Sequence, residues 1–117
     1  MKPEEPKDDD LKWLLIDFDQ TVAHNSGHPD YFPAEPLQGA REALEALEKE
    51  GWKITIYTAR PWSGYSVVES WLDQHQIPHR RIICGKPLGR FIIDDRNLEF
   101  HGNWTDVLKK IPKLNGG

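Results

Sequence analysis

The sequence predicts a single α/β domain in which a mostly parallel, Rossmann-like sheet carries helices on both faces. Short continuous apolar runs, typical of strands covered on both sides, alternate along the chain with segments of helical periodicity. The length of 117 residues suits one domain with one core. A hydrophobic fraction of 38% and a charged fraction of 29% are those of an ordinary water-soluble domain.

Four short segments carry the strand pattern. Residues 12–18 (KWLLIDF) form a continuous apolar run, and residues 52–59 (WKITIYTA) are rich in β-branched and aromatic side chains. Residues 80–84 (RRIIC) and 90–94 (RFIID) are shorter runs of the same kind. Separated by helical segments, the first three are expected to lie parallel, and the fourth completes the sheet.

Three segments carry the helical pattern. Residues 37–51 place apolar side chains at i, i+3, i+4 and i+7, and Gly51 stands where a left-handed C-terminal cap is expected. Residues 65–76 form a second amphipathic segment. Residues 104–111 are expected to form the last helix, with Asn103 as its N-terminal capping residue.

The remaining segments define the expected organisation of the chain. Residues 1–10 are charged and proline-rich, which predicts a disordered acidic tail, and residues 113–117 read as a frayed end. The folded domain is expected over residues 11–112. Within it, residues 20–36 form a long loop, which we expect to act as a flap because long loops in compact domains are often functional.

Charge and cysteine content limit the functional classes. The formal net charge is −4, and the first ten residues hold five acids and two lysines, so the rest of the chain is nearly neutral. Nucleic acid is therefore not a favoured partner, although a local basic pair could touch phosphates. The sequence lacks an apolar stretch long enough for a membrane span, and one cysteine, Cys84, suits a reducing cytoplasm. A cytoplasmic location and no membrane partner are expected.

Each expected strand ends in residues that could bind a phosphate or a metal ion. They are Asp17 and Asp19 at the end of the first, Thr58, Ala59 and Arg60 at the end of the second, Lys86 after the third, and Asp94 and Asp95 at the end of the fourth. Because ligands of open parallel sheets bind at the carboxyl ends of the strands, these residues should meet at one rim. Carboxylates from two strands make an oxygen-rich site suited to Mg²⁺, which would offset their mutual repulsion. With Lys86 and the Thr58 hydroxyl, such a site could bind a phosphoryl group.

The motifs DFDQT, YTAR, GKP and IIDD, in this order and each after an expected strand, resemble those of the haloacid dehalogenase superfamily over about residues 13–111. The resemblance implies a phosphatase, because the acid at Asp19 is absent from the dehalogenating branch. It implies that Asp17 is the nucleophile and Asp19 the general acid/base. It also implies phosphate binding by Thr58, Ala59, Arg60 and Lys86, and Mg²⁺ binding by Asp17, Asp19, Asp94 and Asp95.

The sequence departs from the family pattern in two ways. Gln20 stands where the family usually has glycine, so it is strained if the turn needs a positive φ, unless its amide is placed near the substrate. Only 38 residues separate Asp19 from Thr58, and 27 separate Thr58 from Lys86. Neither interval can hold the cap domain of larger members. The resemblance is therefore to a small capless member.

Several alternatives remain open on the sequence alone. Arg60 and Arg96 could each contact substrate or pair with an acid to hold the loops. Trp62 with Tyr65, and Tyr31 with Phe32, could form an aromatic wall near the site or simply pack. Besides a phosphatase acting on a phosphorylated substrate, the chain could be a nucleic-acid 3′-end phosphatase or a phosphate-binding regulatory domain. An oligomer whose second subunit covers the open site is a further option.

Overall fold

The computed structural model describes residues 10–25 and 33–112. The expectations for the acidic tail over residues 1–9, for the centre of the flap with Tyr31 and Phe32, and for residues 113–117 concern residues outside this described part. Two short 3₁₀ turns, Asp10–Lys12 and Trp62–Gly64, accompany the strands and helices.

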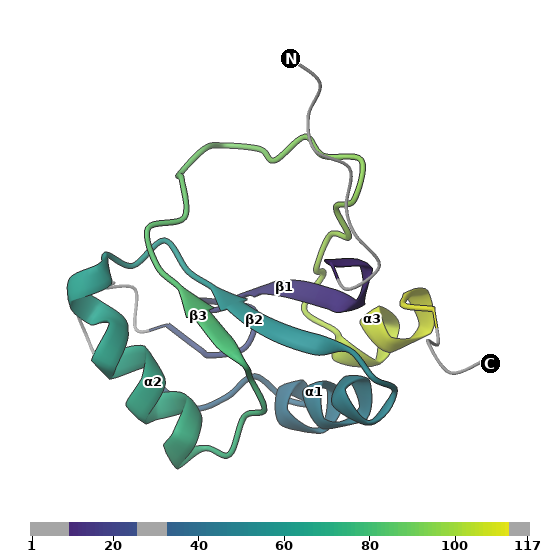
Figure 1. Cartoon of the computed structure of the whole chain (residues 1–117), viewed down its shortest axis with the longest axis horizontal. Coiled ribbons are helices and arrows are strands. Elements are labelled where there is room, and N and C mark those ends of the chain that lie inside the picture. The colour runs from purple at the N-terminus through teal and green to yellow at the C-terminus, as the bar shows by residue number, and fades with distance from the viewer. Residues whose placement is uncertain (1–9, 26–32, 113–117) are drawn as a thin grey trace.

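The sheet has three parallel strands in the order β1 (Trp13–Asp17), β2 (Lys53–Tyr57) and β3 (Arg81–Ile83) (Figure 1). Asp17 lies beside Tyr57, and Tyr57 lies beside Ile83, so the three carboxyl ends meet at one rim. The expected α/β class with a parallel sheet is confirmed.

Three helices connect and follow these strands: α1 (Ala40–Lys49), α2 (Tyr65–Gln74) and α3 (Trp104–Lys110). The capping expectations are also confirmed. Gly51, just after α1, has φ 102°, a conformation that favours glycine. Asn103 caps α3, because its side chain accepts a hydrogen bond from the Asp106 amide at 3.2 Å.

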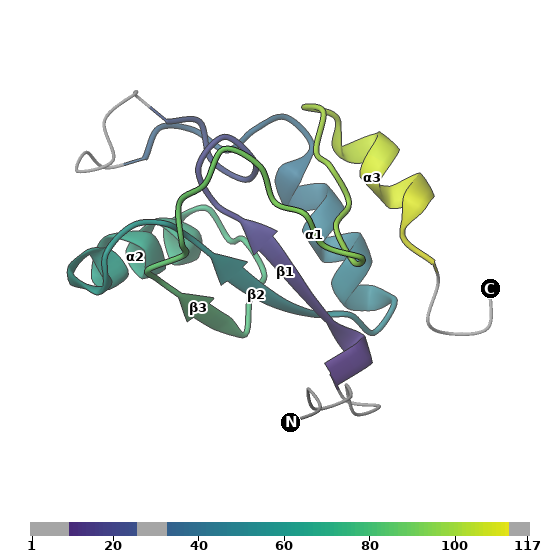
Figure 2. The same ribbon diagram turned by 90° about the horizontal axis from the view of Figure 1, so that it is seen from above.

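The core forms on one face of the sheet. Alternate strand residues Ile16, Ile54, Ile56 and Ile82 are buried in one cluster with the apolar sides of all three helices. On the opposite face, Leu15 is 58% exposed. The expectation of helices on both faces of the sheet is wrong for the described part of the chain. The chain moves across the sheet in one direction from β1 to β3, and right-handed crossovers in one direction place α1 and α2 on the same face (Figure 1). Helix α3 packs against α1, beyond the edge of β1 (Figure 2).

The expected strand over residues 90–94 is wrong. In the structure this segment is part of an arm, residues 87–97, that has no helix or strand (Figure 1). An apolar run becomes a strand only where a neighbouring strand takes its backbone hydrogen bonds. Here the segment ends in a local turn instead, in which the Asp94 carboxylate accepts the Arg96 amide at 2.9 Å.

No helix in the described part of the chain is long and apolar enough to cross a membrane.

Candidate functional site

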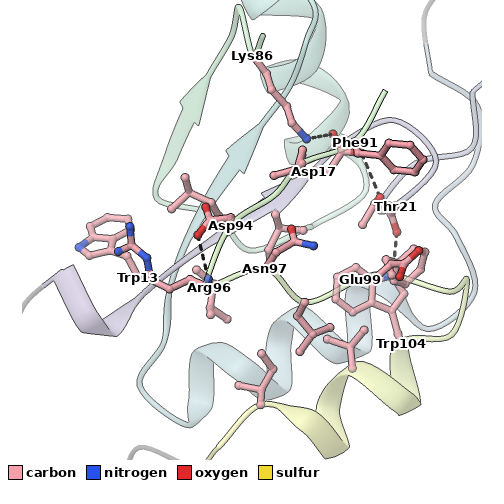
Figure 3. Close-up of a pocket in the computed structure, with 18 of the residues that line it drawn as sticks. Trp13, Asp17, Thr21, Lys86, Phe91, Asp94, Arg96, Asn97, Glu99 and Trp104 are labelled. Atoms are coloured by element: carbon pink, nitrogen blue, oxygen red, sulfur yellow. Dashed lines mark hydrogen bonds and ion pairs between the residues drawn. The ribbon is translucent and has the colours of Figure 1, made fainter. Parts of the chain in front are cut away.

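Asp17, the last residue of β1, is held on both carboxylate oxygens. Its Oδ1 lies 3.3 Å from the Lys86 ammonium nitrogen, and its Oδ2 accepts a hydrogen bond from the Thr21 hydroxyl at 3.1 Å (Figure 3). The Asp17 side chain is 38% exposed and the Lys86 side chain 19% exposed. The carboxylate is therefore oriented by a cation and a hydroxyl while it remains open to solvent.

Backbone pairing beyond the ends of β2 and β3 brings Lys86 to this position. The Lys86 amide donates to the Thr58 carbonyl at 2.9 Å, and the Gly85 amide donates to the Arg60 carbonyl at 2.8 Å. Gly85 has φ 78°, which a residue with a side chain rarely adopts. The Lys86 ammonium group also lies 5.3 Å from the centre of the Tyr57 ring. The sequence GK at this strand end thus directs a lysine toward the neighbouring aspartate.

Asp19 is bound by Arg60. The Arg60 guanidinium donates to Asp19 Oδ1 at 2.9 Å and to Oδ2 at 3.1 Å, a bidentate geometry. Arg60 is 4% exposed and its guanidinium lies 5.6 Å from the centre of the Phe18 ring. Asn25 Nδ2 donates a further hydrogen bond to Asp19 Oδ1 at 3.2 Å. Of the two roles left open for Arg60, the structure shows the pair with an acid, and phosphate binding by Arg60 stays a prediction.

The turn after Asp19 requires a positive φ at Gln20, a conformation that strains a residue with a side chain. Gln20 has φ 64°, and its side-chain oxygen accepts the Asn25 amide at 3.1 Å. At the next residue, the Thr21 carbonyl accepts a hydrogen bond from the Trp104 indole N–H at 2.8 Å. The side chain of Gln20 therefore braces the loop, and α3 fixes the residue that binds Asp17.

Thr58 and Ala59 lie at the same rim but make no contact with Asp17 that the structure records. The Thr58 side chain is 1% exposed, and its hydroxyl oxygen accepts the Arg60 amide at 3.1 Å. Ala59 is exposed. Phosphate binding by these two residues stays a prediction.

Asp94 and Asp95 lie on the arm. Asp94 lines the same cleft as Asp17 (Figure 3), whereas the Asp95 side chain is 92% exposed, with Asp95 Oδ1 3.7 Å from Arg96 Nε. The hydrogen bond from the Arg96 amide, with one involving the Asp95 side chain, lowers the pKa of Asp94 below its ordinary value. Asp94 is therefore ionised at neutral pH.

The cleft has a volume of about 840 Å³ and runs along the outer edge of β1. Asp17, Thr21 and Lys86 lie at one end of it, and Trp13 lies toward the other (Figure 3). The arm forms one wall, and residues of α1 and α3 form another.

Donor chemistry at the cleft suits Mg²⁺, because Asp17 and Asp94 offer carboxylate oxygens. Within residues 10–25 and 33–112, no three histidine, cysteine, aspartate or glutamate side chains are grouped closely enough to hold a metal ion. Of the four aspartates of the predicted metal site, the structure thus brings Asp17 and Asp94 to one cleft without joining them into a ligand set.

Two aromatic side chains of the expected wall, Trp62 and Tyr65, stack at this rim. Their rings lie 6.0 Å apart at an interplanar angle of 15°, and Trp62 is 58% exposed.

Cys84, just after the end of β3, is buried. Burial raises the pKa of the Cys84 thiol, which makes it a poor nucleophile.

Sequence reasoning missed Asn25 and the bond from Trp104 to the Thr21 carbonyl. A polar amide six residues after Asp19, in a loop that returns toward it, was the available signal for Asn25. The Trp104 bond joins positions 83 residues apart and has no local signal.

Comparison with known proteins gives one structural relative and no family. No protein-family model matches the chain, and no curated protein matches it. The crystal structure of an MCSG target from Vibrio cholerae is similar, with a TM-score of 0.62 and 28% sequence identity. The match covers 85% of this chain and 98% of the other. The similarity extends over nearly the whole of the Vibrio cholerae chain and supports a shared fold.

Proposed function

We propose that the chain is a Mg²⁺-dependent phosphatase of the haloacid dehalogenase type, which hydrolyses a phosphoric monoester through an aspartyl-phosphate on Asp17. The observation that carries the proposal is the placement of Asp17. Its carboxylate ends a parallel strand, contacts a lysine at 3.3 Å and a threonine hydroxyl at 3.1 Å, and opens on a cleft. The lysine and the hydroxyl hold the carboxylate in one orientation, as a positioned nucleophile requires.

In the first step, an Asp17 oxygen bonds to phosphorus while the bond between phosphorus and the ester oxygen breaks. Asp19, in its protonated form, gives its proton to the leaving oxygen. In the second step, water attacks phosphorus and gives a proton to Asp19, and the bond from Asp17 to phosphorus breaks to release inorganic phosphate. Lys86 would bind the phosphoryl oxygens.

The hydrogen bonds of Asp19 determine which of its two oxygens can carry the proton of the acid/base step. Both Asp19 oxygens accept hydrogen bonds from Arg60, but each oxygen has two lone pairs, so an oxygen that accepts one hydrogen bond can still carry a proton. Oδ2 is the simpler choice, because Oδ1 also accepts from Asn25. We therefore assign the transferred proton to Oδ2.

Bound Mg²⁺ would neutralise negative charge on the phosphoryl oxygens. Asp17 and Asp94 are the carboxylates of the cleft that would hold it, and Asp95 and the Asp19 backbone carbonyl would complete the set.

The test is phosphate release from p-nitrophenyl phosphate with Mg²⁺, with EDTA, and by the Asp17→Asn variant. We expect turnover that requires the metal and is abolished in Asp17→Asn. Asp73→Asn is the matched control, because it makes the same chemical change at a side chain that is 69% exposed on α2. Turnover by folded Asp17→Asn at the wild-type rate would contradict the role of Asp17.

Active protein would next be tested on nucleotides, sugar phosphates and 3′-phosphorylated DNA ends, which separates a small-molecule phosphatase from an end-repair enzyme. If folded protein that binds Mg²⁺ hydrolyses none of these substrates, the phosphatase proposal fails. Phosphate binding without turnover would then identify a regulatory domain.

A further inference from the structure

Trp62 differs from the other four tryptophans of the chain in its exposure. The side chains of Trp52, Trp71 and Trp104 are buried, and that of Trp13 is half-buried. Trp62 is 58% exposed, although an indole is one of the largest apolar surfaces that a protein can place in water. Tryptophan is enriched at binding interfaces, where a partner covers the ring. The exposure of Trp62 therefore indicates a surface that a ligand covers.

The position of the Trp62 ring is fixed by its neighbours. The residue begins the 3₁₀ turn Trp62–Gly64, and its ring stacks on that of Tyr65, with the ring centres 6.0 Å apart and the planes at 15°. Its Nε1 and Cδ1 atoms lie 3.6 and 3.8 Å from the place that a Cβ atom would occupy at Gly85. One face of the indole is thus covered by Tyr65, and one edge lies against Gly85. The exposed surface includes the opposite face of the ring.

This ring lies beside the residues that would bind the phosphoryl group. Gly85 directly precedes Lys86, whose ammonium nitrogen lies 3.3 Å from Asp17 Oδ1. The Gly85 amide donates to the Arg60 carbonyl at 2.8 Å, so a hydrogen bond joins the loop that carries Trp62 to the loop that carries Lys86. A phosphate bound by Lys86 would therefore have the indole against the preceding residue of the same loop.

The part of a substrate beyond its phosphate must be bound at the rim itself. The intervals between the motifs are too short to hold a cap domain, so these contacts must come from the loops that follow the strands. Residues 58–64 follow β2 and residues 84–86 follow β3, and Trp62 is the one aromatic residue in these two segments. It provides them with a flat apolar surface, the kind of surface that binds a planar ring.

We propose that the open face of Trp62 stacks on the base of a nucleoside monophosphate whose phosphate is bound at Asp17 and Lys86. The inference rests on the proposed function and names the substrate class of the same site. Stacking of a base on an aromatic side chain strengthens binding by roughly 5- to 150-fold. Because every base has an aromatic face, the stack favours nucleotides over sugar phosphates and distinguishes little between one base and another.

A free nucleotide fits the charge of the chain better than a nucleic acid does. Outside the first ten residues, the acidic and basic side chains nearly balance. A nucleic acid strand is bound through several cations that contact successive phosphates, whereas a mononucleotide carries one phosphate, which Lys86 can bind. The ligand of Trp62 is therefore assigned as a mononucleotide.

The test compares 5′-AMP with ribose 5-phosphate, two monoesters of the same sugar that differ only in the base. We expect the wild-type kcat/KM to be at least about tenfold higher for 5′-AMP, and this ratio to fall below about twofold in Trp62→Leu. Trp62→Phe is the matched control, because it keeps an aromatic face and should keep most of the preference. A loss of folded protein lowers both rates alike, so the ratio reports the contact with the base.

Binding to the Asp17→Asn variant with Mg²⁺ tests the stack without turnover. We expect 5′-AMP to quench tryptophan emission and to bind at least about five times more tightly than ribose 5-phosphate by titration calorimetry. Adding Trp62→Leu should abolish both effects. If the wild-type protein hydrolyses neither compound while this binding is observed, the phosphatase proposal fails and the stacking inference stands.

Three results would overturn the inference. One is equal kcat/KM for the two compounds, which would leave the phosphatase proposal intact. Another is a preference for 5′-AMP that persists unchanged in Trp62→Leu. The third is hydrolysis of a 3′-phosphorylated oligonucleotide more than about tenfold faster than that of 5′-AMP, which would identify a nucleic-acid end as the ligand instead of a free nucleotide.

Discussion

Arg60 binds both carboxylate oxygens of Asp19, at 2.9 and 3.1 Å, from a position 41 residues further along the chain. The pair joins the loop after β1 to the loop after β2 and so fixes the distance between the two loops that carry the site. A bidentate pair with one nearly buried partner is stronger than the ion pairs of the surface.

Replacing Arg60 by methionine, which keeps much of its bulk, should lower the free energy of unfolding by about 2–3 kcal/mol, because it leaves Asp19 without its cation in a partly buried position. Arg60→Lys should cause a smaller loss in the free energy of unfolding than Arg60→Met, since lysine keeps the charge and loses only the bidentate geometry. Urea unfolding measures both. Arg41→Met is the control: Arg41 pairs with exposed glutamates at 3.7 and 3.8 Å, and the loss should be about 0.5 kcal/mol or less. Equal losses at both positions would contradict this ranking.

Replacing Lys86 by methionine should lower kcat/KM by roughly 10²-fold, because one charged group that stabilises the transition state is removed. The free energy of unfolding should change little, since the Asp17 side chain is 38% exposed and can be hydrated instead. Lys110→Met, which removes an exposed pair with Asp106 at 3.0 Å on α3, is the matched control and should leave kcat/KM unchanged. A similar loss in both variants would argue against a role for Lys86 at the site.

Gln20 and Gln76 are the two described residues other than glycine with positive φ, 64° and 56°. Gln76→Gly should stabilise the protein by about 1 kcal/mol, because glycine adopts this conformation without strain. Gln20→Gly should gain less, since it also loses the hydrogen bond from the Asn25 amide at 3.1 Å. The two midpoints of urea unfolding give the comparison. A larger gain at position 20 than at position 76 would show that the side chain of Gln20 does not brace the loop.

The Cys84 thiol should react slowly with a disulfide reagent at pH 8, and its rate should rise only at higher pH than that of the unfolded chain, because burial raises its pKa. The raised pKa also makes the free energy of unfolding depend on pH. At a pH between the two pKa values, the thiol keeps its proton in the folded protein and loses it in the unfolded chain. The contribution of Cys84 to stability is therefore complete below the unfolded pKa, about 8.5, and is lost as pH rises through the folded pKa. Cys84→Ala should remove both effects, and a rate profile matching the unfolded chain would contradict them.

The sequence predicts which residues meet at the rim of the sheet, because the carboxyl ends of parallel strands lie at one edge whatever the side chains are. Asp17 ends β1 and Lys86 follows β3, and the carboxyl ends of these parallel strands lie at the same rim with β2 between them, so the meeting at 3.3 Å requires only that the strands be recognised. The caps at Gly51 and Asn103 follow from local backbone geometry in the same way.

Other features depend on choices that residue types do not determine. Arg60 could bind phosphate or an acid with the same chemistry, and its partner is decided by where the loop places Asp19. Residues 90–94 have the composition of a strand, but a strand also needs a free edge and a chain path to reach it. Composition alone says nothing of that path.

The indole of Trp104 ties the loop that orients Asp17 to a helix 83 positions later in the chain. During synthesis, residues 11–25 leave the ribosome long before residue 104 does. The loop therefore lacks this hydrogen bond while β1, α1 and β2 fold. We expect the nascent chain to gain its sheet early and to acquire a correctly shaped site only in the last stage of synthesis, so a truncated chain would fold in part and remain inactive.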